Sequence, residues 1–146
     1  MMRITYLLTF LLLVASIKAA TLEDLFLRLN AAGTEYSVLD CDSTASGTLD
    51  IPNTYGGLPV TLIEAGAFAS CTNLTSITIG DSVESIEQSA FLNCTGLTNV
   101  TITESVTSIG VQAFQGCSSL TTIAIPDSVN TIGYAAFNLC SSLTSI

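Results

Sequence analysis

The chain has 146 residues, of which 49% are hydrophobic and only 10% are charged, and its formal net charge is −9. This length allows one domain of modest size. An acidic chain whose only base after residue 18 is Arg28 is a poor partner for nucleic acid or for an anionic membrane surface. The lack of histidine removes the commonest general base and the commonest zinc ligand, so we expect no catalysis, no metal site and no cofactor.

Residues 1–20, MMRITYLLTFLLLVASIKAA, place one early positive charge before an apolar run from Ile4 to about Ile17. This order is typical of a secretory signal peptide, with cleavage compatible with the small residues at 16, 19 and 20. An uncleaved membrane anchor is the alternative, although a bilayer takes about 20 apolar residues and this run is shorter. Residues 1–20 therefore predict a secreted or cell-surface protein.

Residues 21–47 are expected to form an N-terminal cap. The segment from Thr21 to about Asn30 predicts a short amphipathic helix, with Thr21 as N-cap, Asp24 as its reciprocal partner and Gly33 as the stop. The apolar face of this helix consists of Leu22, Leu25, Phe26 and Leu29. A strand is predicted at residues 36–40 and a polar turn at 40–47. Such a capping helix would cover the apolar end of the structure that follows.

From residue 63 onward the sequence repeats with a constant period, and successive copies begin at residues 63, 86, 109 and 132. Three full copies and one partial copy cover residues 63–85, 86–108, 109–131 and 132–146. Five columns recur in register: Ile63/Ile86/Ile109/Ile132, Ala67/Ala90/Ala113/Ala136, Phe68/Phe91/Phe114/Phe137, Cys71/Cys94/Cys117/Cys140 and Leu74/Leu97/Leu120/Leu143. Residues 48–63 resemble a degenerate first coil, since Leu49 and Ile51 align with Ile77 and Ile79. Units of this length bury their apolar residues by stacking, so residues 48–146 predict a repeat solenoid.

Each copy contains the order Leu-x-x-Ile/Val-x-Ile, which begins at Leu74 in the first copy. The alternation predicts a short half-buried strand, with Ile77 inside and Ser76 and Thr78 outside. Such strands stack at about 4.8 Å into a parallel sheet. A second extended segment is expected near Val83–Ile86, and the Ala-Phe-x-x-Cys segment predicts one helical or 3₁₀ turn. Each phenylalanine should contribute roughly 2 kcal/mol of burial to the core.

The pattern I-G-x-x-A-F-x-x-C-x-x-L-x-x-I-x-I-P-x-x-V is almost complete at residues 109–129 and resembles the BspA-like leucine-rich repeats. The resemblance covers about residues 48–146. It implies a leucine-rich-repeat solenoid in a secreted or surface-exposed protein of bacteria or parasitic protists, associated with adhesion to host matrix or other cells. Serines stand where leucine-rich repeats at large have asparagine, and we expect their hydroxyls to bond neighbouring backbone: Ser82, Ser105 and Ser128.

The outward columns of the predicted sheet are the candidate partner-binding surface. One column contains Ser76, Asn99 and Thr122, and the other contains Thr78, Thr101 and Ala124. Solenoids commonly bind proteins or glycans through such an extended face. The columns hold no aromatic or arginine anchor of the kind that dominates binding hot spots, so a plain polar coating is the alternative.

Three sequons place possible N-glycosylation sites at Asn73, Asn93 and Asn99. They matter only in a eukaryotic source. Asn99 belongs to an outward column of the predicted sheet. A glycan on Asn99 would therefore obstruct the face proposed for partner binding.

The four cysteines in register lie one coil apart in a straight file, so they do not converge on a metal ion. Free buried thiols that act as small hydrophobes and disulfides between adjacent coils both stay open. Cys41 lies outside the register and is either reactive or paired elsewhere. An acidic file at Asp81, Glu104 and Asp127 is expected to be a row of solvated turn residues, with a calcium bridge as the alternative.

The last copy stops at Ile146, inside a predicted strand, which favours a fragment of a longer repeat protein. Two functions follow. The first is an extracellular leucine-rich-repeat protein, not an enzyme, that mediates interaction or adhesion with protein or glycan partners. The second is an N-terminal binding module of a larger secreted enzyme or receptor. Membrane contact is expected only through the leader or through a C-terminal anchor beyond residue 146.

Overall fold

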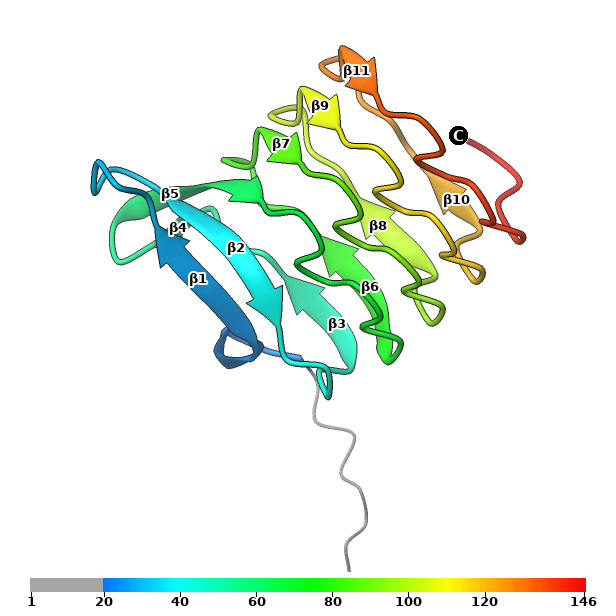
Figure 1. The fold of residues 1–146 in the computed structure, drawn as a ribbon, viewed down its shortest axis with the longest axis horizontal. Coiled ribbons are helices and arrows are strands. Elements are labelled where there is room, and N and C mark those ends of the chain that lie inside the picture. Colours follow the sequence, from blue (N-terminus) through cyan, green and yellow to red (C-terminus); the bar gives the residue numbers. More distant parts are fainter. Residues whose placement is uncertain (1–19) are drawn as a thin grey trace, which may run out of the picture.

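In the computed structural model, residues 20–146 are described and form a stack of coils that runs from an N-terminal cap to the C-terminus (Figure 1). The predicted signal peptide, apart from Ala20, lies outside the described residues. The elements in chain order are η1 (Leu22–Asp24), β1 (Leu25–Leu29), β2 (Tyr36–Cys41), β3 (Gly47–Asp50), β4 (Thr54–Tyr55), β5 (Leu58–Ile63), β6 (Leu74–Thr78), β7 (Ser85–Ile86), β8 (Asn99–Thr101), β9 (Ser108–Ile109), β10 (Thr122–Ile123) and β11 (Thr131–Ile132). Across residues 20–146, no helix has the length and apolar character needed to span a membrane.

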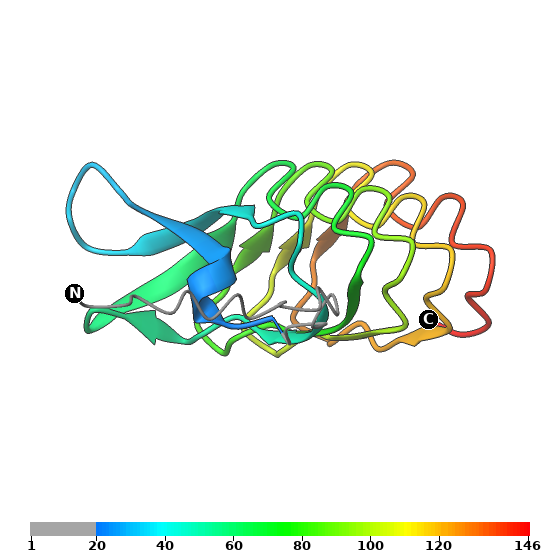
Figure 2. The ribbon, with the colours of Figure 1, turned by 90° about the horizontal axis from the view of Figure 1, so that it is seen from below.

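Two sheets line opposite sides of the stack, as Figures 1 and 2 show. The four-stranded sheet has the order β10-β8-β6-β3 and is parallel throughout. The second sheet has the order β1-β2-β5-β7-β9-β11, and β4 pairs with β5 in an antiparallel hairpin. Each regular coil therefore contributes one strand to each sheet, which confirms the two extended segments predicted for each repeat.

The pairing register confirms the repeat length. Ile77 of β6 pairs with Val100 of β8, and Ile86 of β7 pairs with Ile109 of β9, so each residue pairs with its equivalent in the next copy. The predicted degenerate first coil is also confirmed, because Leu49 of β3 pairs with Ile77 of β6. The chain from residue 48 is thus a parallel β-solenoid whose strands alternate between inward apolar and outward polar side chains.

A column of phenylalanine rings forms the centre of the core. The ring centroids of Phe68, Phe91, Phe114 and Phe137 are separated by 4.8, 5.0 and 5.4 Å, with nearly parallel planes. The first three rings are fully buried. Each Ala-Phe-x-x-Cys segment is a turn with 3₁₀-like hydrogen bonds, such as the 3.0 Å bond from the Cys71 N–H to the Phe68 carbonyl. These turns do not continue as helices, because their N–H groups also bond the next coil, as from Phe68 to Ala90 at 2.7 Å.

Two positions in every coil take a left-handed backbone conformation. Both flank the Ala-Phe turn and recur with the repeat: Gly66/Ser89/Gln112/Ala135 and Ser70/Asn93/Gly116/Leu139, all with φ between 56° and 76°. Six of these eight residues carry a Cβ atom, although this conformation strains residues other than glycine. The stacking of neighbouring coils therefore imposes a backbone shape that the local sequence does not favour.

The predicted capping helix is wrong. Thr21 and Asp24 do form the expected reciprocal cap, with Thr21 N donating to Asp24 Oδ2 at 2.6 Å, but only a single 3₁₀ turn follows, at Leu22–Asp24. From Leu25 the chain becomes β1 and pairs antiparallel with β2. Three members of the predicted apolar helix face are exposed instead: Leu22 (42%), Phe26 (55%) and Leu29 (43%).

The reason lies in the sequence LFLRL, which fits a two-residue period as well as a helical one. As a strand, it buries Leu25 and packs Leu27 against the core, while it gains backbone partners on β2. Gly33, expected to stop a helix, lies instead in the turn of the β1–β2 hairpin, where its N–H donates to the Asn30 carbonyl at 3.1 Å. The predicted strand at 36–40 is confirmed as β2.

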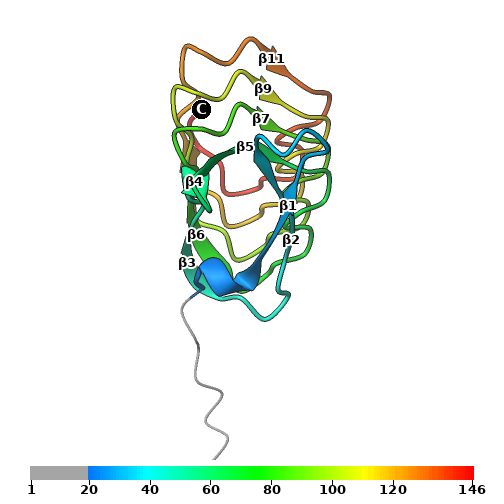
Figure 3. The same ribbon diagram turned by 90° about the vertical axis from the view of Figure 1, so that its left-hand side faces the viewer.

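The hairpin still performs the capping role. Figure 3 views the stack from this end and shows β1 and β2 across the first coil. β2 adds to β5 in parallel, with a register shift between Tyr36 and Ser37. Arg28 donates to Glu64 Oε2 at 2.6 Å, and Ser37 donates to the same carboxylate. The cap is therefore attached to the solenoid by sheet pairing and by one charged contact.

Candidate functional site

The two outward columns lie on the four-stranded sheet, as predicted. Ser76 pairs with Asn99 and Thr78 with Thr101 across β6 and β8, and Thr122 of β10 pairs with Asn99. All six predicted residues face outward, and all except the half-buried Ser76 are exposed, including Ala124 just beyond β10. The sheet therefore presents two rows of small, mostly polar side chains at a spacing of about 4.8 Å.

The rows extend further than the prediction placed them. On β3, exposed Thr48 pairs with Ser76 and exposed Asp50 pairs with Thr78. At the other end, Ser145 forms an isolated bridge with Thr122. The outward positions of Thr48 and Asp50 could have been predicted from the alignment of Leu49 with Ile77, because the residues on either side of an inward leucine in a strand face outward.

Six other hydroxyls on the coils bond a backbone carbonyl of the preceding coil, namely those of Thr98, Thr103, Thr107, Ser128, Ser141 and Thr144. Thr98 donates to the Thr75 carbonyl at 2.9 Å, and Thr107 donates to the Glu84 carbonyl at 3.1 Å. Ser128 donates to the Val106 carbonyl at 2.8 Å, which confirms at that position the predicted role of the serines that replace asparagine. These hydroxyls hold the coils together and are not available to a partner.

The columns on the four-stranded sheet differ in this respect. Asn99 Nδ2 lies 3.3 Å from Ser76 Oγ. The hydroxyls of Thr78, Thr101 and Thr122 make no hydrogen bond to any of the residues that the structure describes. These threonines contribute nothing to coil stacking through their hydroxyls, so they remain free to bond another molecule.

The three sequon asparagines are all exposed. Asn73 directly precedes β6, and Asn93 follows the Ala-Phe turn of its coil; neither belongs to the outward columns. Asn93 takes a left-handed conformation, and its side chain fills the space beside Gly116, where an added Cβ would lie 2.3 Å from Asn93 Oδ1. Asn99 lies in the sheet face itself, at the beginning of β8.

The acidic file is exposed at Asp81, Glu104 and Asp127. No cluster of three or more carboxylate, thiol or imidazole groups in residues 20–146 is arranged to hold a metal ion. A shallow groove of about 650 Å³ lies beside this file, and Glu35, Asp81 and Glu84 line it together with threonine, serine and proline. All the charged residues that line this groove are therefore acidic.

The cysteines are unbridged and buried, which agrees with thiols that act as small hydrophobes. Three of them donate to the phenylalanine carbonyl of the preceding coil: Cys94 to Phe68 at 3.0 Å, Cys117 to Phe91 at 3.2 Å and Cys140 to Phe114 at 3.1 Å. The hydrogen bond with Cys140 lowers the pKa of Cys117, but the bond with Cys94 and burial together raise that pKa to about 12. The hydrogen bond with Cys117, followed by burial, raises the pKa of Cys140. The thiols of Cys117 and Cys140 therefore stay protonated near neutral pH.

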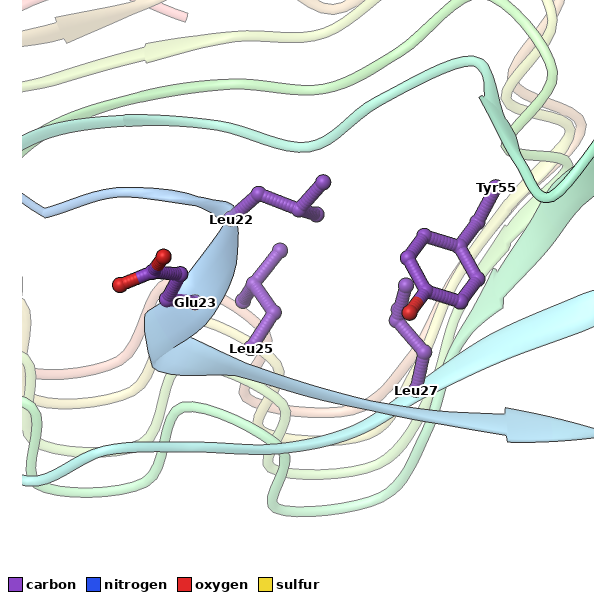
Figure 4. A pocket seen from close by; sticks show the side chains of 5 residues that line it. All are labelled: Leu22, Glu23, Leu25, Leu27 and Tyr55. Carbon is purple, nitrogen blue, oxygen red and sulfur yellow. The ribbon is translucent and has the colours of Figure 1, made fainter.

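A pocket of about 450 Å³ opens in the N-terminal cap (Figure 4). Leu22 and Leu25 face Tyr55 across the opening, and Leu27 lies beneath, while Glu23 points away. The Tyr55 ring also packs edge-to-face on Tyr36, with centroids 5.0 Å apart. This pocket could not be predicted from the sequence, because it depends on β1 being a strand.

Stacked parallel coils, each with a Leu-x-x-Ile/Val strand and an outward polar face, define a leucine-rich-repeat protein. The chain belongs to the BspA-type family: the family model described as "BspA type Leucine rich repeat region (6 copies)" matches residues 60–146. The predicted resemblance is therefore confirmed. Among curated proteins, no sequence matches this chain.

Solved leucine-rich-repeat proteins share the fold. The T. pallidum leucine-rich-repeat protein aligns with a TM-score of 0.74 and 24% identity, over 87% of this chain and 70% of its own. A leucine rich cell surface protein of Faecalibacterium prausnitzii gives 0.71 and 28%, over 84% and 37%. A leucine-rich-repeat protein of Bacteroides capillosus gives 0.67 and 30%, over 77% and 89%. This chain thus spans little more than a third of the F. prausnitzii protein.

Family membership indicates a role in protein interaction, because leucine-rich-repeat proteins generally bind proteins. The family and the solved relatives are repeat proteins, and one relative is described as a cell surface protein.

Proposed function

We propose that the protein is an extracellular adhesion or interaction protein that binds protein or glycan partners through the outward columns of the four-stranded sheet, without catalysis. The observation that carries this proposal is the contrast between two sets of hydroxyls. Those of Thr98 and Thr107 bond backbone of the preceding coil, whereas those of Thr78, Thr101 and Thr122 have no partner within the described chain.

Two further observations support the proposed extracellular location. Residues 1–20 have the charge and apolar pattern of a secretory leader. The F. prausnitzii relative is described as a cell surface protein, and it is 28% identical over 84% of this chain. Both favour a secreted or surface-attached protein.

N-glycosylation at Asn73, Asn93 and Asn99 belongs to the same proposal for a eukaryotic source. All three side chains are exposed. A glycan on Asn99 would replace its contact with Ser76 and cover the outward columns. We therefore propose that occupancy at Asn73 and Asn93 is compatible with binding, whereas occupancy at Asn99 blocks it.

The test is binding of the full chain to an array of matrix proteins and glycans, beside two variants. The first changes the outward residues Ser76, Thr78, Thr101 and Thr122 to lysine. The matched control changes four exposed hydroxyl residues outside the four-stranded sheet to lysine, namely Thr72, Thr95, Thr131 and Ser142. Circular dichroism verifies that each variant is folded.

We expect the first variant to lose binding and the control to retain it. Equal loss in both variants would mean that added positive charge, rather than the sheet face, disturbs binding. No binding by any form would assign the coils a spacer role and contradict the proposal.

A second candidate function is a binding module of a larger secreted enzyme or receptor. It is favoured by the lengths of the relatives, since this chain covers only 37% of the F. prausnitzii protein and 39% of a leucine-rich-repeat protein of Bacteroides ovatus. The genomic sequence downstream of the codon for Ile146 distinguishes the two. Further coils or an anchor would favour the adhesion protein, and a catalytic domain would favour the module.

A further inference from the structure

β1 is an open edge of the second, seven-stranded sheet, and Figure 3 shows it at the end of the stack. Among residues 20–146 it pairs only with β2, on one of its two sides. The Asp24 carbonyl accepts a 2.8 Å bond from the residue after β2, and the Asn30 N–H donates a 2.9 Å bond to the residue before β2. Alternate residues of an antiparallel strand bond the same neighbour. The backbone groups of Leu27 and Leu29 therefore point to the side that no described strand occupies.

Large apolar side chains are exposed beside this edge. Phe26 and Leu29 of β1 are exposed, and so are Leu22 and Tyr55, which line the pocket in the cap. An open edge strand with apolar side chains is a template for pairing with another chain, and natural proteins usually protect such edges with charges, proline or a covering segment. Arg28 is the only charged residue of β1. The edge is therefore suited to a partner that adds a strand to the sheet.

The sequence of β1, LFLRL, is complementary to itself in the antiparallel direction. When two copies pair about a two-fold axis at Leu27, this residue lies opposite its own equivalent, and Leu25 lies opposite Leu29 of the second copy. On the other face of the strand, Phe26 lies opposite Arg28 of the second copy, and the two-fold axis repeats this contact. Residues directly opposite each other interact, and a guanidinium group is attracted to an aromatic ring. The strand thus carries both halves of its own binding surface.

The open side of β1 favours this register over its neighbours. An axis at Leu27 pairs all five residues of the strand, and the two Leu27 residues exchange both of their free N–H···O bonds. An axis at Phe26 would leave Leu29 without a partner strand, and an axis at Arg28 would place two arginines opposite each other. With the axis at Leu27, the two acidic residues just before β1 come opposite Asn30 and an alanine, so no carboxylates are brought together.

We propose that two copies of this chain join head to head, with β1 of one copy antiparallel to β1 of the other. The seven-stranded sheet then continues from one solenoid into the second across a two-fold axis. The exposed Leu29 of each copy gains Leu25 of the other as an apolar neighbour, in the wall of the pocket in the cap. The outward columns belong to the four-stranded sheet and take no part in this contact, so the dimer presents them twice.

The test is the mass of the full chain in solution, measured by sedimentation equilibrium over a range of concentrations. We expect a species with twice the mass of one chain, which is 15.2 kDa. Amide hydrogen exchange then locates the contact. The N–H groups of Leu27 and Leu29 should exchange slowly in the dimer and quickly in the monomer, whereas those of Phe26 and Arg28, which face β2, should exchange slowly in both. A chain that is monomeric at every concentration would overturn the proposal.

Two opposite charges at position 26 test the register. Phe26→Lys places a lysine opposite Arg28 of the second copy on both sides of the axis, and should raise the dissociation constant of the dimer at least about tenfold. Phe26→Glu places a carboxylate opposite the same arginine and should retain the dimer. Net charge alone predicts the reverse order, because the chain carries −9 and a lysine reduces that charge. The reverse order, or equal dissociation constants, would overturn the proposal.

Two further variants separate this edge from the rest of the surface. Leu29→Pro removes an N–H that faces the open side, where edge strands tolerate proline, and should give a folded monomer. Val111→Lys adds the same charge at an exposed apolar residue of a regular coil and should leave the dimer unchanged. Circular dichroism verifies the fold of each variant. A dimer that survives Leu29→Pro, or one that Val111→Lys abolishes, would contradict the proposal. These measurements use no ligand, so their outcome is separate from that of the binding array.

Discussion

The regular coils and the N-terminal cap hold their apolar side chains in place in different ways. In the coils each contact occurs again one repeat later, as in the stack of Phe68, Phe91 and Phe114. In the cap each contact occurs once: the Arg28–Glu64 ion pair and the capping bond between Thr21 and Asp24 have no counterpart elsewhere in the described chain. Stability in the coils is therefore a sum of similar interfaces, whereas the cap depends on individual contacts.

This difference predicts where a substitution does most damage. A change within a column of an internal coil disturbs the interfaces on both sides of that coil, because each internal coil is bonded to two neighbours. A change in the cap disturbs one interface only. Four measurements test whether the coils and the cap differ in this way.

The largest effect is expected for Phe91→Ala, which removes a fully buried ring between two stacked neighbours. We expect a loss of about 4 kcal/mol in the free energy of unfolding, measured by urea denaturation. Leu25→Ala is the matched variant in the cap, where the side chain is 8% exposed, and should cost about 2 kcal/mol. Equal losses would show that the cap is as strongly coupled to the core as the central coils are.

Alkaline pH should destabilise the coils through their buried thiols. The ordinary pKa of a cysteine thiol is 9.0, and in the folded chain that of Cys117 is raised to about 12. Between these values the unfolded chain has released a proton that the folded chain retains, so stability is complete below pH 9 and falls by about 1.4 kcal/mol per pH unit toward pH 12. Cys117→Ala should remove this contribution from the pH slope of unfolding. An unchanged slope would contradict the assignment.

Glycine substitutions compare backbone crowding in the two regions. A Cβ atom on Gly110 would lie 2.5 Å from the Glu87 carbonyl carbon, so Gly110→Ala should force two coils apart and cost about 2–3 kcal/mol. Gly33 in the cap hairpin has a φ of 72° and nothing within 4 Å of such an atom, so Gly33→Ala should cost only about 1 kcal/mol of backbone strain. Thermal unfolding of both variants measures the difference, and a reversed order would refute the crowding argument.

The smallest effect concerns the ion pair of the cap. The Arg28 side chain is 60% exposed, so Arg28→Gln should cost less than about 1 kcal/mol, and the loss should shrink in high salt. Glu64→Gln and the double variant complete a double-mutant cycle that isolates the pair. A coupling energy well above about 1 kcal/mol would mean that this single contact, rather than sheet pairing, attaches the cap.

The same contrast explains what the sequence could predict. Ile63, Phe68 and Leu74 are buried as expected. These positions could be predicted because the same apolar residue recurs at the same place in each copy of the repeat. The cap segment carries no such repetition. Its residues Leu22, Leu25 and Leu29 do not separate a helical from a two-residue period over so short a length, and pairing with β2, which follows closely in the chain, decides in favour of a strand.

In the candidate site, too, only the features that recur with the repeat could be predicted from the sequence. The outward positions of Ser76, Thr78 and Thr101 could be predicted from strand alternation alone. The sequence could not predict which of the hydroxyls bond backbone and which remain free. Those bonds depend on the side-chain rotamer and on the positions of the carbonyl groups in the neighbouring coil.

The short strands have a mechanical consequence. β7, β9 and β11 contain two residues each, so adjacent coils are joined by small groups of hydrogen bonds rather than by one long ladder. A chain pulled from both ends, as between two surfaces in flow, would lose one coil at a time. Each released coil would add about 75 Å of extended chain. The curve of force against extension would then show a series of similar steps, one for each coil. The chain would lengthen step by step under load before it is fully unfolded.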